Sequence, residues 1–569
     1  MLKFQRAKGQ KTLPRYVQLL LALSSGVMGL SAWPTLAAEK ITLNYPPLGP
    51  ISISVASLEA FAKDGTVGSD LAPFIRLAPP NQLGQLREAL QRRFAVTPTM
   101  VSQFAATQTG RVAFLRVGQI LQTSTNQNGG TALKTAFSKA SANPQGLTIL
   151  DLFQQFPDTS ITVNGKLGFQ AITAVLNSVR DRDLIIAALR KQATATPAIT
   201  VPPQPDLLKA GPMNWTMQTL TFQNPNRPNQ TLQIPANIYI PQGLTSPAPV
   251  IVISHGLGSN RTTFIYLAEQ LVSYGFVVAV PEHPGTSTQQ VDRLLAGQLD
   301  YNPAEVANEM INRPLDIKYL LDALTQKATS DPAWQGKMDL ANVGVWGQSL
   351  GGYTVLATAG ATLNYAGMRD QCPKLETNLF SFNVSLPLQC TTIDGKSTLD
   401  NFRDERVKAV IAVNPLTSLL FGEPGMSKIN IPTLLVAGSD DVFAPPIPEQ
   451  VTPFTWLTTP DKFLMMVQRG THFSFLGDAT AVNEAFAIPP EILGPSPASA
   501  RPAMKAISVA FFKRFLTNDN GFQPYLSQSY AQKLSQQPFS IDLTQSFSQA
   551  DLQQAIAPPS SSRSSSPAK

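Results

Sequence analysis

In the second half of the chain, short and almost continuous apolar runs alternate with stretches long enough to form helices. Strands that are joined by helices pair in parallel, and the helices cover both faces of the sheet. The pattern therefore predicts an α/β domain with a mainly parallel sheet between residues 213 and 516. The runs expected to form its central strands are PVIVIS (249–254), GFVVAVP (275–281), NVGVWG (342–347), VKAVIAVNP (407–415), IPTLLVAG (431–438) and KFLMMVQ (462–468).

The first part of the chain follows a different pattern, because its apolar residues recur mostly at helical spacing. In LGQLREALQRRF, for example, Leu83, Leu86, Leu90 and Phe94 fall on one face of a helix. Residues 41–192 are therefore predicted to form a smaller, mainly helical domain. They contain no histidine and no recognisable catalytic constellation.

Segments of biased composition mark the limits of the two predicted domains. The stretch ATATPAITVPPQPD is rich in proline and small residues, which predicts an extended linker over residues 193–212. Residues 517–569 are rich in glutamine and serine and are predicted to form a tail, disordered at its end.

The N-terminus has the pattern of an export signal. A basic start is followed by an apolar run from Tyr16 to Trp33 and then by small residues, with cleavage expected after Ala37 or Ala38. Residues 1–38 are therefore predicted to direct the protein to the periplasm or the exterior. An uncleaved signal anchor is the alternative, since the apolar run is only slightly shorter than a membrane span.

Composition argues against a nucleic-acid partner. The formal net charge is +7, but five basic residues precede Glu39, and beyond them 39 basic residues face 37 acidic ones. Cys372 and Cys390 are the only cysteines, and a disulfide between them is expected in an oxidising compartment. Two cysteines without a nearby histidine make a poor metal site, and no metal or cofactor is expected.

A candidate nucleophile lies in the sequence GQSLG, where Gly347 and Gly351 flank Ser349. Gly-x-Ser-x-Gly alone is a modest signal, but here an apolar strand precedes it and a helix-forming run follows. This is the setting of a nucleophile elbow, a tight strand-to-helix turn that projects a serine hydroxyl from the edge of a sheet.

A serine hydroxyl needs a base within hydrogen-bond reach, and the base needs an orienting carboxylate. Of the three histidines, only His472 follows the serine, directly after the last apolar strand. Asp440 and Asp441 follow the preceding strand, which completes the order Ser, Asp, His. Asp441 is favoured by its spacing from Gly438, and Asp440 is the alternative acid.

An oxyanion hole is also required, in which N–H groups meet the developing negative charge. Leu350, which follows the nucleophile, is expected to supply one N–H. The loop after the strand 249–254 reads His255-Gly256-Leu257-Gly258, and Leu257 is the expected second donor. His255 is interpreted as a scaffold residue of this loop, and His283 as a residue that shapes a turn.

Five motifs together resemble the α/β-hydrolase superfamily, nearest to its platelet-activating-factor acetylhydrolase and dienelactone hydrolase branches. The motifs are SHGLGSNRTTF, VVAVPEHPG, GQSLGG, AGSDD and GTHFSF. The resemblance implies the roles given above for Ser349, His472, Leu257 and Leu350. It has one departure, since the acetylhydrolase branch carries its acid where this chain has Asn414. The N-terminal region resembles an uncharacterised helical domain found in front of some bacterial hydrolases.

Residues 361–406 form an insertion between predicted elements, with both cysteines and the apolar run LFSFNVSLPL. It is interpreted as a cap over an apolar pocket, or else as a surface excursion. The sequence thus predicts an exported serine hydrolase that cleaves small-molecule carboxylic (acyl) esters, with lipid-like or other apolar esters favoured. Two alternatives remain: an inactive hydrolase-fold binding protein, and a protein whose N-terminal helices dock to a membrane or envelope surface. The oligomeric state is left open.

Overall fold

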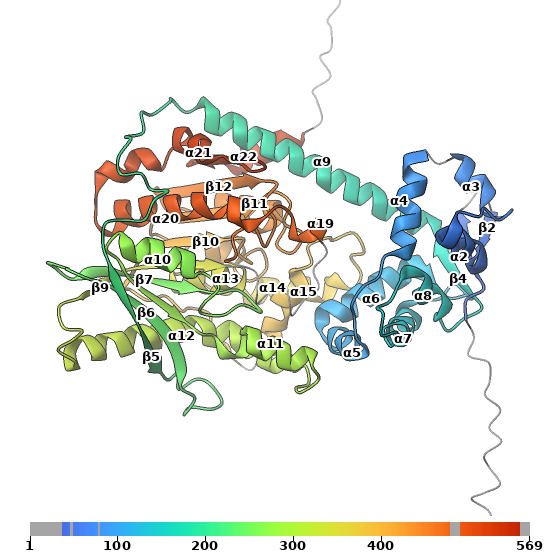
Figure 1. Cartoon of the computed structure of the whole chain (residues 1–569), viewed down its shortest axis with the longest axis horizontal. Helices are drawn as coiled ribbons and strands as arrows, with labels where there is room; N and C mark the ends of the chain where they lie inside the picture. The colour runs from blue at the N-terminus through green and yellow to red at the C-terminus, as the bar shows by residue number, and fades with distance from the viewer. Residues whose placement is uncertain (1–36, 46–48, 78–79, 396, 478–489, 558–569) are drawn as a thin grey trace, which may run out of the picture.

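The computed structural model describes residues 37–45, 49–77, 80–395, 397–477 and 490–557, which fold into two parts (Figure 1). We call residues 37–195 the N-terminal module and residues 213–556 the larger domain. Two predicted segments lie outside the described residues: the export signal, except for its last two residues, and the last dozen residues of the tail. Within the described residues, no helix combines the length and apolar character that a bilayer span requires.

The N-terminal module combines a small sheet with a larger set of helices. Its four strands have the order β2-β1-β4-β3, with β1 and β4 parallel. The strands are β1 (Lys40–Tyr45), β2 (Gly49–Ser54), β3 (Leu121–Gln122) and β4 (Ser160–Asn164). The helices are α2 (Val55–Asp64), α3 (Ala72–Leu77), α4 (Pro80–Gln91), α5 (Pro98–Ala106), α6 (Gln108–Ile120), α7 (Gly130–Ala140) and α8 (Ile149–Gln154).

A single long helix, α9 (Gly165–Ala195), leaves this module and runs along the larger domain towards α22 (Gln549–Ile556), as Figure 1 shows. Asn164 caps its first turn by accepting a hydrogen bond from the backbone N–H of Leu167. The runs GFQAITAVLNSV (168–179) and DLIIAALRKQ (183–192) predict two separate shorter helices, whereas the structure has one continuous helix. The buried residues of α9 lie mainly in its second half, where it packs on the larger domain.

The larger domain is built on a nine-stranded sheet of order β13-β12-β11-β10-β9-β7-β8-β6-β5. The six strands from β12 to β8 in this order pair in parallel, so the predicted mainly parallel sheet is confirmed. The strands are β5 (Trp215–Phe222), β6 (Ile234–Pro241), β7 (Ala248–Ser254), β8 (Val277–Pro281), β9 (Met338–Gln348), β10 (Val407–Val413), β11 (Thr433–Gly438), β12 (Lys462–Gln468) and β13 (Ser540–Thr544).

Helices cover both faces of this sheet, as the uninterrupted apolar runs require. Along β7, Val250 and Val252 join one core, while Ile251 and Ile253 join the core on the other face. The first face carries α12 (Pro303–Ser330), α13 (Leu350–Thr358) and α17 (Thr452–Trp456), and the second carries α10 (Ile265–Ser273), α20 (Arg501–Leu516) and α21 (Gln528–Leu534).

The segment 517–556, which the sequence predicts to be part of a tail, is folded onto the larger domain. Its strand β13 pairs antiparallel with β12, and the alternating residues Ile541 and Leu543 are buried in the core. This pairing covers the open edge of β12, which would otherwise expose its N–H and C=O groups. The average glutamine and serine content of the segment hid this short apolar alternation.

Candidate active site

Ser349 lies in a strained turn between β9 and α13. Its backbone has φ +58° and ψ −122°, a conformation that L-residues rarely adopt. A Cβ atom at Gly347 would lie 2.1 Å from the carbonyl oxygen of Gly351, and one at Gly351 would lie 2.0 Å from that of Ser254. Both flanking positions therefore require glycine, and the turn directs the serine to the carboxyl edge of the sheet.

The structure brings Ser349, His472 and Asp441 together from the ends of three strands. His472 Nε2 lies 2.8 Å from Ser349 Oγ, and His472 Nδ1 lies 2.7 Å from Asp441 Oδ2. The other carboxylate oxygen of Asp441, Oδ1, accepts the backbone N–H groups of Phe443 and Ala444, each at 2.8 Å. These two donors fix the orientation of the buried carboxylate, which in turn orients the His472 ring towards Ser349.

Asp440 occupies a different environment from its neighbour. Its side chain is 46% exposed, and its Oδ1 lies 3.3 Å from Nη1 of Arg182 on α9. The side chain of Asp441 is fully buried against His472. Of the two candidate acids, only Asp441 therefore contacts the histidine.

Asn414 stands at the position where the resembling acetylhydrolase branch carries its acid. It has a positive φ of 44°, its Oδ1 accepts the N–H of Gly438 at 3.1 Å, and its Nδ2 donates to the carbonyl of Thr471 at 3.3 Å. Asn414 thus ties the end of β10 to the segments that carry Asp441 and His472. Sequence reasoning noted the missing carboxylate at this position but did not find this bridging role.

The loop of residues 255–258, in which the sequence predicts an oxyanion donor and which we call the oxyanion loop, packs directly against Ser349. A Cβ atom at Gly256 would lie 3.2 Å from Cβ of Ser349, so only glycine allows this close approach. The carbonyl of Gly256 lies 2.8 Å from His255 Nδ1, while His255 Nε2 accepts the backbone N–H of His283 at 3.0 Å. Because Nε2 is an acceptor, the ring proton is on Nδ1 and is donated to Gly256.

This bond sets the direction of the following N–H group. The C=O and N–H of a trans peptide point in opposite directions. With the Gly256 carbonyl held by His255, the N–H of Leu257 points away from the His255 ring. The orientation of this peptide is therefore fixed on the loop that adjoins Ser349. His255, which the sequence suggests is a scaffold residue, makes the contact that fixes this peptide.

Two family models match parts of the chain. Residues 221–301 match "Platelet-activating factor acetylhydrolase, isoform II", and residues 37–164 match "Alpha/beta hydrolase of unknown function (DUF1400)". The chain has the α/β-hydrolase fold and resembles the platelet-activating-factor acetylhydrolase branch. No curated protein matches it.

The two matches differ in what they cover of this hydrolase. The acetylhydrolase match includes the oxyanion loop but ends before Ser349, Asp441 and His472. The second match lies entirely within the N-terminal module. The assignment of the three candidate catalytic side chains therefore rests on their geometry and not on these matches.

A second serine–histidine–aspartate constellation lies beneath the oxyanion loop of the hydrolase. His283 Nε2 lies 2.9 Å from Ser254 Oγ, and His283 Nδ1 lies 2.9 Å from Asp316 Oδ2. All three residues are completely buried, so no substrate reaches this serine. Burial, together with the nearby guanidinium of Arg313, lowers the pKa of His283 well below 6.5 and keeps the ring neutral.

Arg313 connects this buried network to the oxyanion loop. Its guanidinium donates to the carbonyl of His255 and to the hydroxyl of Thr286, and burial lowers its pKa to about 9. The carboxylate of Asp316 is bound by Arg227 from the loop between β5 and β6, with N–O distances of 3.0 and 2.6 Å. The network is a support for the oxyanion loop, and sequence reasoning did not identify its arginines.

The insertion at residues 361–406 is cross-linked within itself and is joined to the rest of the domain by a buried carboxylate. Cys372 and Cys390 form the expected disulfide, with a Cα–Cα distance of 5.6 Å. Glu449 is fully buried and accepts hydrogen bonds from Gln389 of the insertion at 2.8 Å and from the backbone N–H of Thr417 at 2.7 Å. The side chains of Asn383, Ser385 and Ser418 also donate to Glu449. This buried carboxylate therefore joins the insertion to the loop after β10.

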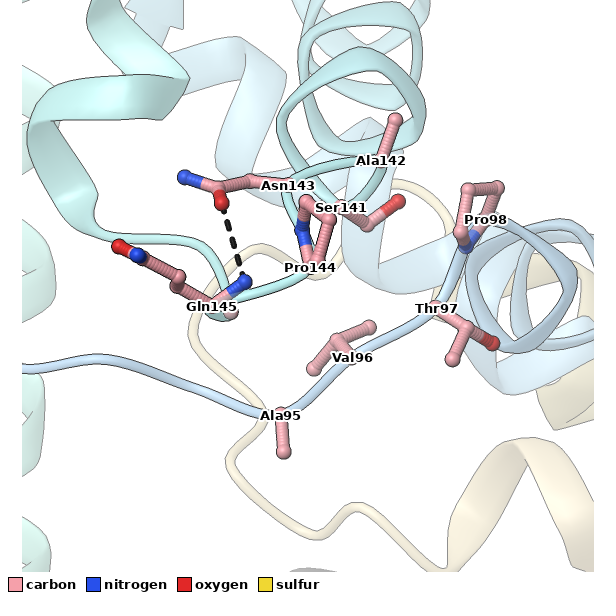
Figure 2. A pocket seen from close by; sticks show the side chains of 10 residues that line it. Ala95, Val96, Thr97, Pro98, Ser141, Ala142, Asn143, Pro144 and Gln145 are labelled. Atoms are coloured by element: carbon pink, nitrogen blue, oxygen red, sulfur yellow. Dashed lines mark hydrogen bonds between the residues drawn. The ribbon is translucent and has the colours of Figure 1, made fainter.

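A pocket of about 480 Å³ lies in the N-terminal module, between residues 95–98 and 141–146 (Figure 2). Asn143 Oδ1 accepts the backbone N–H of Gln145 at 3.0 Å along one wall. None of its lining residues carries an ionisable side chain. Nor do the described residues of the hydrolase contain a group of three or more histidine, cysteine, aspartate or glutamate side chains placed to hold a metal ion.

Proposed function

We propose that the protein is an exported serine esterase that cleaves apolar acyl esters through an acyl-enzyme on Ser349. The observation that carries this proposal is the continuous hydrogen-bonded row Ser349–His472–Asp441, with distances of 2.8 and 2.7 Å. Its elements stand in the order and at the strand ends that nucleophilic catalysis on this fold requires. The resemblance to an acetylhydrolase branch favours an ester as the substrate.

In the proposed reaction, Ser349 Oγ attacks the carbonyl carbon of the ester while His472 Nε2 takes the hydroxyl proton. The negative charge on the carbonyl oxygen is met by the N–H groups of Leu350 and Leu257. His472 then gives its proton to the departing alkoxide, and the acyl group remains on the serine. Throughout, the carboxylate of Asp441 accepts the Nδ1–H of His472 and stabilises the transient imidazolium.

The second half of the reaction regenerates the serine. Water attacks the acyl-enzyme while His472 takes one of its protons, and this proton returns to Ser349 Oγ as the carboxylic acid leaves. Both halves therefore combine nucleophilic attack at the acyl carbon with proton transfer through His472.

Apolar side chains left exposed around the site favour an apolar substrate. On the segments that carry the proposed oxyanion donor and acid, Leu257 is 46%, Val442 is 49% and Phe443 is 38% exposed. The insertion adds Phe380, Phe382 and Val384 to the exposed apolar residues. Exposed apolar surface of this kind, next to a nucleophile, is typical of a site that binds a hydrophobic ligand.

Export is supported by two independent features. The first 38 residues have the pattern of a secretory signal, and the Cys372–Cys390 disulfide is stable in an oxidising compartment. Fractionation of expressing cells should therefore recover a protein shortened by 37 or 38 residues outside the cytoplasm. A full-length cytoplasmic protein would contradict the proposed export.

Activity is tested with the purified protein on p-nitrophenyl esters of graded acyl length. We expect hydrolysis by the wild type and a loss of about 10⁴-fold or more in kcat for Ser349→Ala, since the nucleophile is removed. Equal turnover by the two proteins would refute the assignment of Ser349. Absence of turnover by the wild type on every ester would instead favour an inactive, ligand-binding hydrolase fold.

A further inference from the structure

Polar contacts from the N-terminal module end on segments that follow the carboxyl ends of strands in the larger domain. Gln103 of α5 donates to the carbonyl of Leu299 at 2.8 Å and accepts the N–H of Tyr301 at 3.1 Å, both beyond β8. In parallel sheets, substrates bind at this carboxyl edge. These contacts place the module beside the carboxyl edge of the sheet. Figure 1 shows the module at one end of the larger domain.

Arg116 of α6 makes the contact with the insertion. Its Nε and Nη2 atoms donate to the carbonyl of Leu375 at 3.1 and 2.6 Å, and its Nη1 atom donates to the carbonyl of Ser381 at 2.8 Å. The guanidinium is half-buried, and this burial lowers its pKa. The insertion is thus held by the module through Arg116 and by the loop after β10 through Glu449, while the disulfide links two positions within the insertion. These contacts fix the position of the insertion.

Arg182 of α9 makes the contact with the segment of the proposed acid. Its Nη1 atom lies 3.3 Å from Asp440 Oδ1 and 3.5 Å from the carbonyl of Ser439. On a helix, residues three and seven positions apart lie on the same face. Val179 and Val175 therefore lie on the face of α9 that Arg182 turns towards the larger domain.

These two valines remain open to solvent although their helix face is directed at the domain. Val175 is 42% and Val179 is 40% exposed. They extend over about 10 Å of helix, at 1.5 Å per residue, from the Arg182 contact towards the module. On the segment that Arg182 contacts, Val442 and Phe443 follow Asp440 and are also exposed. The Phe443 ring lies 5.5 Å from the His472 ring.

We propose that the N-terminal module supplies one wall of the acyl-binding site, in which Val175 and Val179 of α9 contact the acyl chain of the ester. The proposal rests on the proposed esterase function. We assign an apolar acyl chain to this wall because the exposed apolar surface continues from Phe443 to α9. An apolar chain that leaves Ser349 past Phe443 would bury further apolar surface along α9, whereas a polar or charged acyl group would gain no binding energy there. Arg182 is a positioning residue that sets the distance between this helix and the acid segment.

The wall is tested by making it polar at nearly constant side-chain size. In Val175→Thr/Val179→Thr, the ratio of kcat/KM for a decanoyl ester to that for an acetyl ester should fall about tenfold, because longer chains lose apolar contacts. Leu184→Gln is the matched control: Leu184 is 42% exposed on the same helix but lies on the opposite face from Arg182. This control should keep the wild-type ratio.

A second pair of variants tests the position of the helix. Arg182→Ala should lower the same ratio, whereas Arg180→Ala should not, since Arg180 contacts only its neighbour Asp181 at 2.8 Å among the ion pairs described. Thermal unfolding measured alongside verifies that all variants are folded. Hydrolysis by every variant with an unchanged ratio would overturn the proposed wall alone. Failure of the wild type to hydrolyse any ester would overturn the proposed function and the wall with it.

Discussion

An Asp441→Asn variant should lose most esterase activity although its side chain keeps the same shape. In the wild type, Oδ1 accepts the N–H groups of Phe443 and Ala444, and Oδ2 accepts the Nδ1–H of His472. The asparagine oxygen must remain opposite the two backbone donors, so its NH₂ group faces His472. The amide then donates to Nδ1, which places the ring proton on Nε2, opposite Ser349.

In that tautomer the histidine cannot accept the serine proton. The same substitution in a serine protease triad lowers kcat about 10⁴-fold, and we expect a loss of about 10³- to 10⁴-fold here with a similar KM. The measurement is steady-state hydrolysis of the best p-nitrophenyl ester of the panel. Circular dichroism and thermal unfolding of the same samples show whether the variant is folded.

Asp440→Asn is the matched control, since Asp440 is adjacent in the chain and its side chain is 46% exposed. It should retain kcat within about threefold, because Asp441 and not Asp440 contacts His472. If Asp440→Asn were the more damaging change, or if Asp441→Asn kept more than about a tenth of the wild-type kcat, the proposed triad would be wrong.

Three further predictions concern the groups that support the site. Burial lowers the pKa of His283 below 6.5, so the ring takes up a proton mainly on unfolding, and the free energy of unfolding should fall as the pH drops below about 6.5. In His283→Gln, the pH dependence of the free energy of unfolding, measured with denaturant, should decrease by the equivalent of about one proton. An unchanged pH dependence would contradict this. Replacing Cys372 and Cys390 by serine should cost about 3 kcal/mol, since the bridge closes a loop with a sequence separation of 18, and an unaltered melting temperature would argue against any such constraint. Glu449→Gln places an amide NH₂ among buried donors and should lower the free energy of unfolding in urea by about 3 kcal/mol. Glu423→Gln, at an exposed position, is the control and should change it little. Equal urea midpoints for the two variants would refute the role of Glu449.

Local sequence patterns indicated the candidate nucleophile and base because each stands immediately beyond a buried apolar strand. The carboxyl ends of parallel strands lie along one edge of the sheet, so Ser349 after β9 and His472 after β12 are expected at the same edge, although β10 and β11 lie between their strands. Their 2.8 Å contact is seen only in the folded structure. The choice between Asp440 and Asp441 needed the backbone geometry, since only the folded turn decides which carboxylate faces the histidine.

Other features could not be predicted because they depend on contacts between distant parts of the chain. Arg182 and Asp440 are 258 positions apart, and no local pattern indicates that they meet. The strand β13 depends on the free edge of β12, and its short alternation is lost in the average composition of the segment. The role of Asn414 likewise arises from loops that converge only after the sheet has formed.

The most direct test of the account is the site at which a fluorophosphonate attaches to the intact protein. Such a probe reacts with a serine only when a base activates it and an oxyanion site binds it. We predict one phosphonyl group per chain, on the peptide that contains Ser349, and none on Ser349→Ala. Labelling of another residue, labelling that persists in Ser349→Ala, or no labelling of the folded wild type would contradict the central claim.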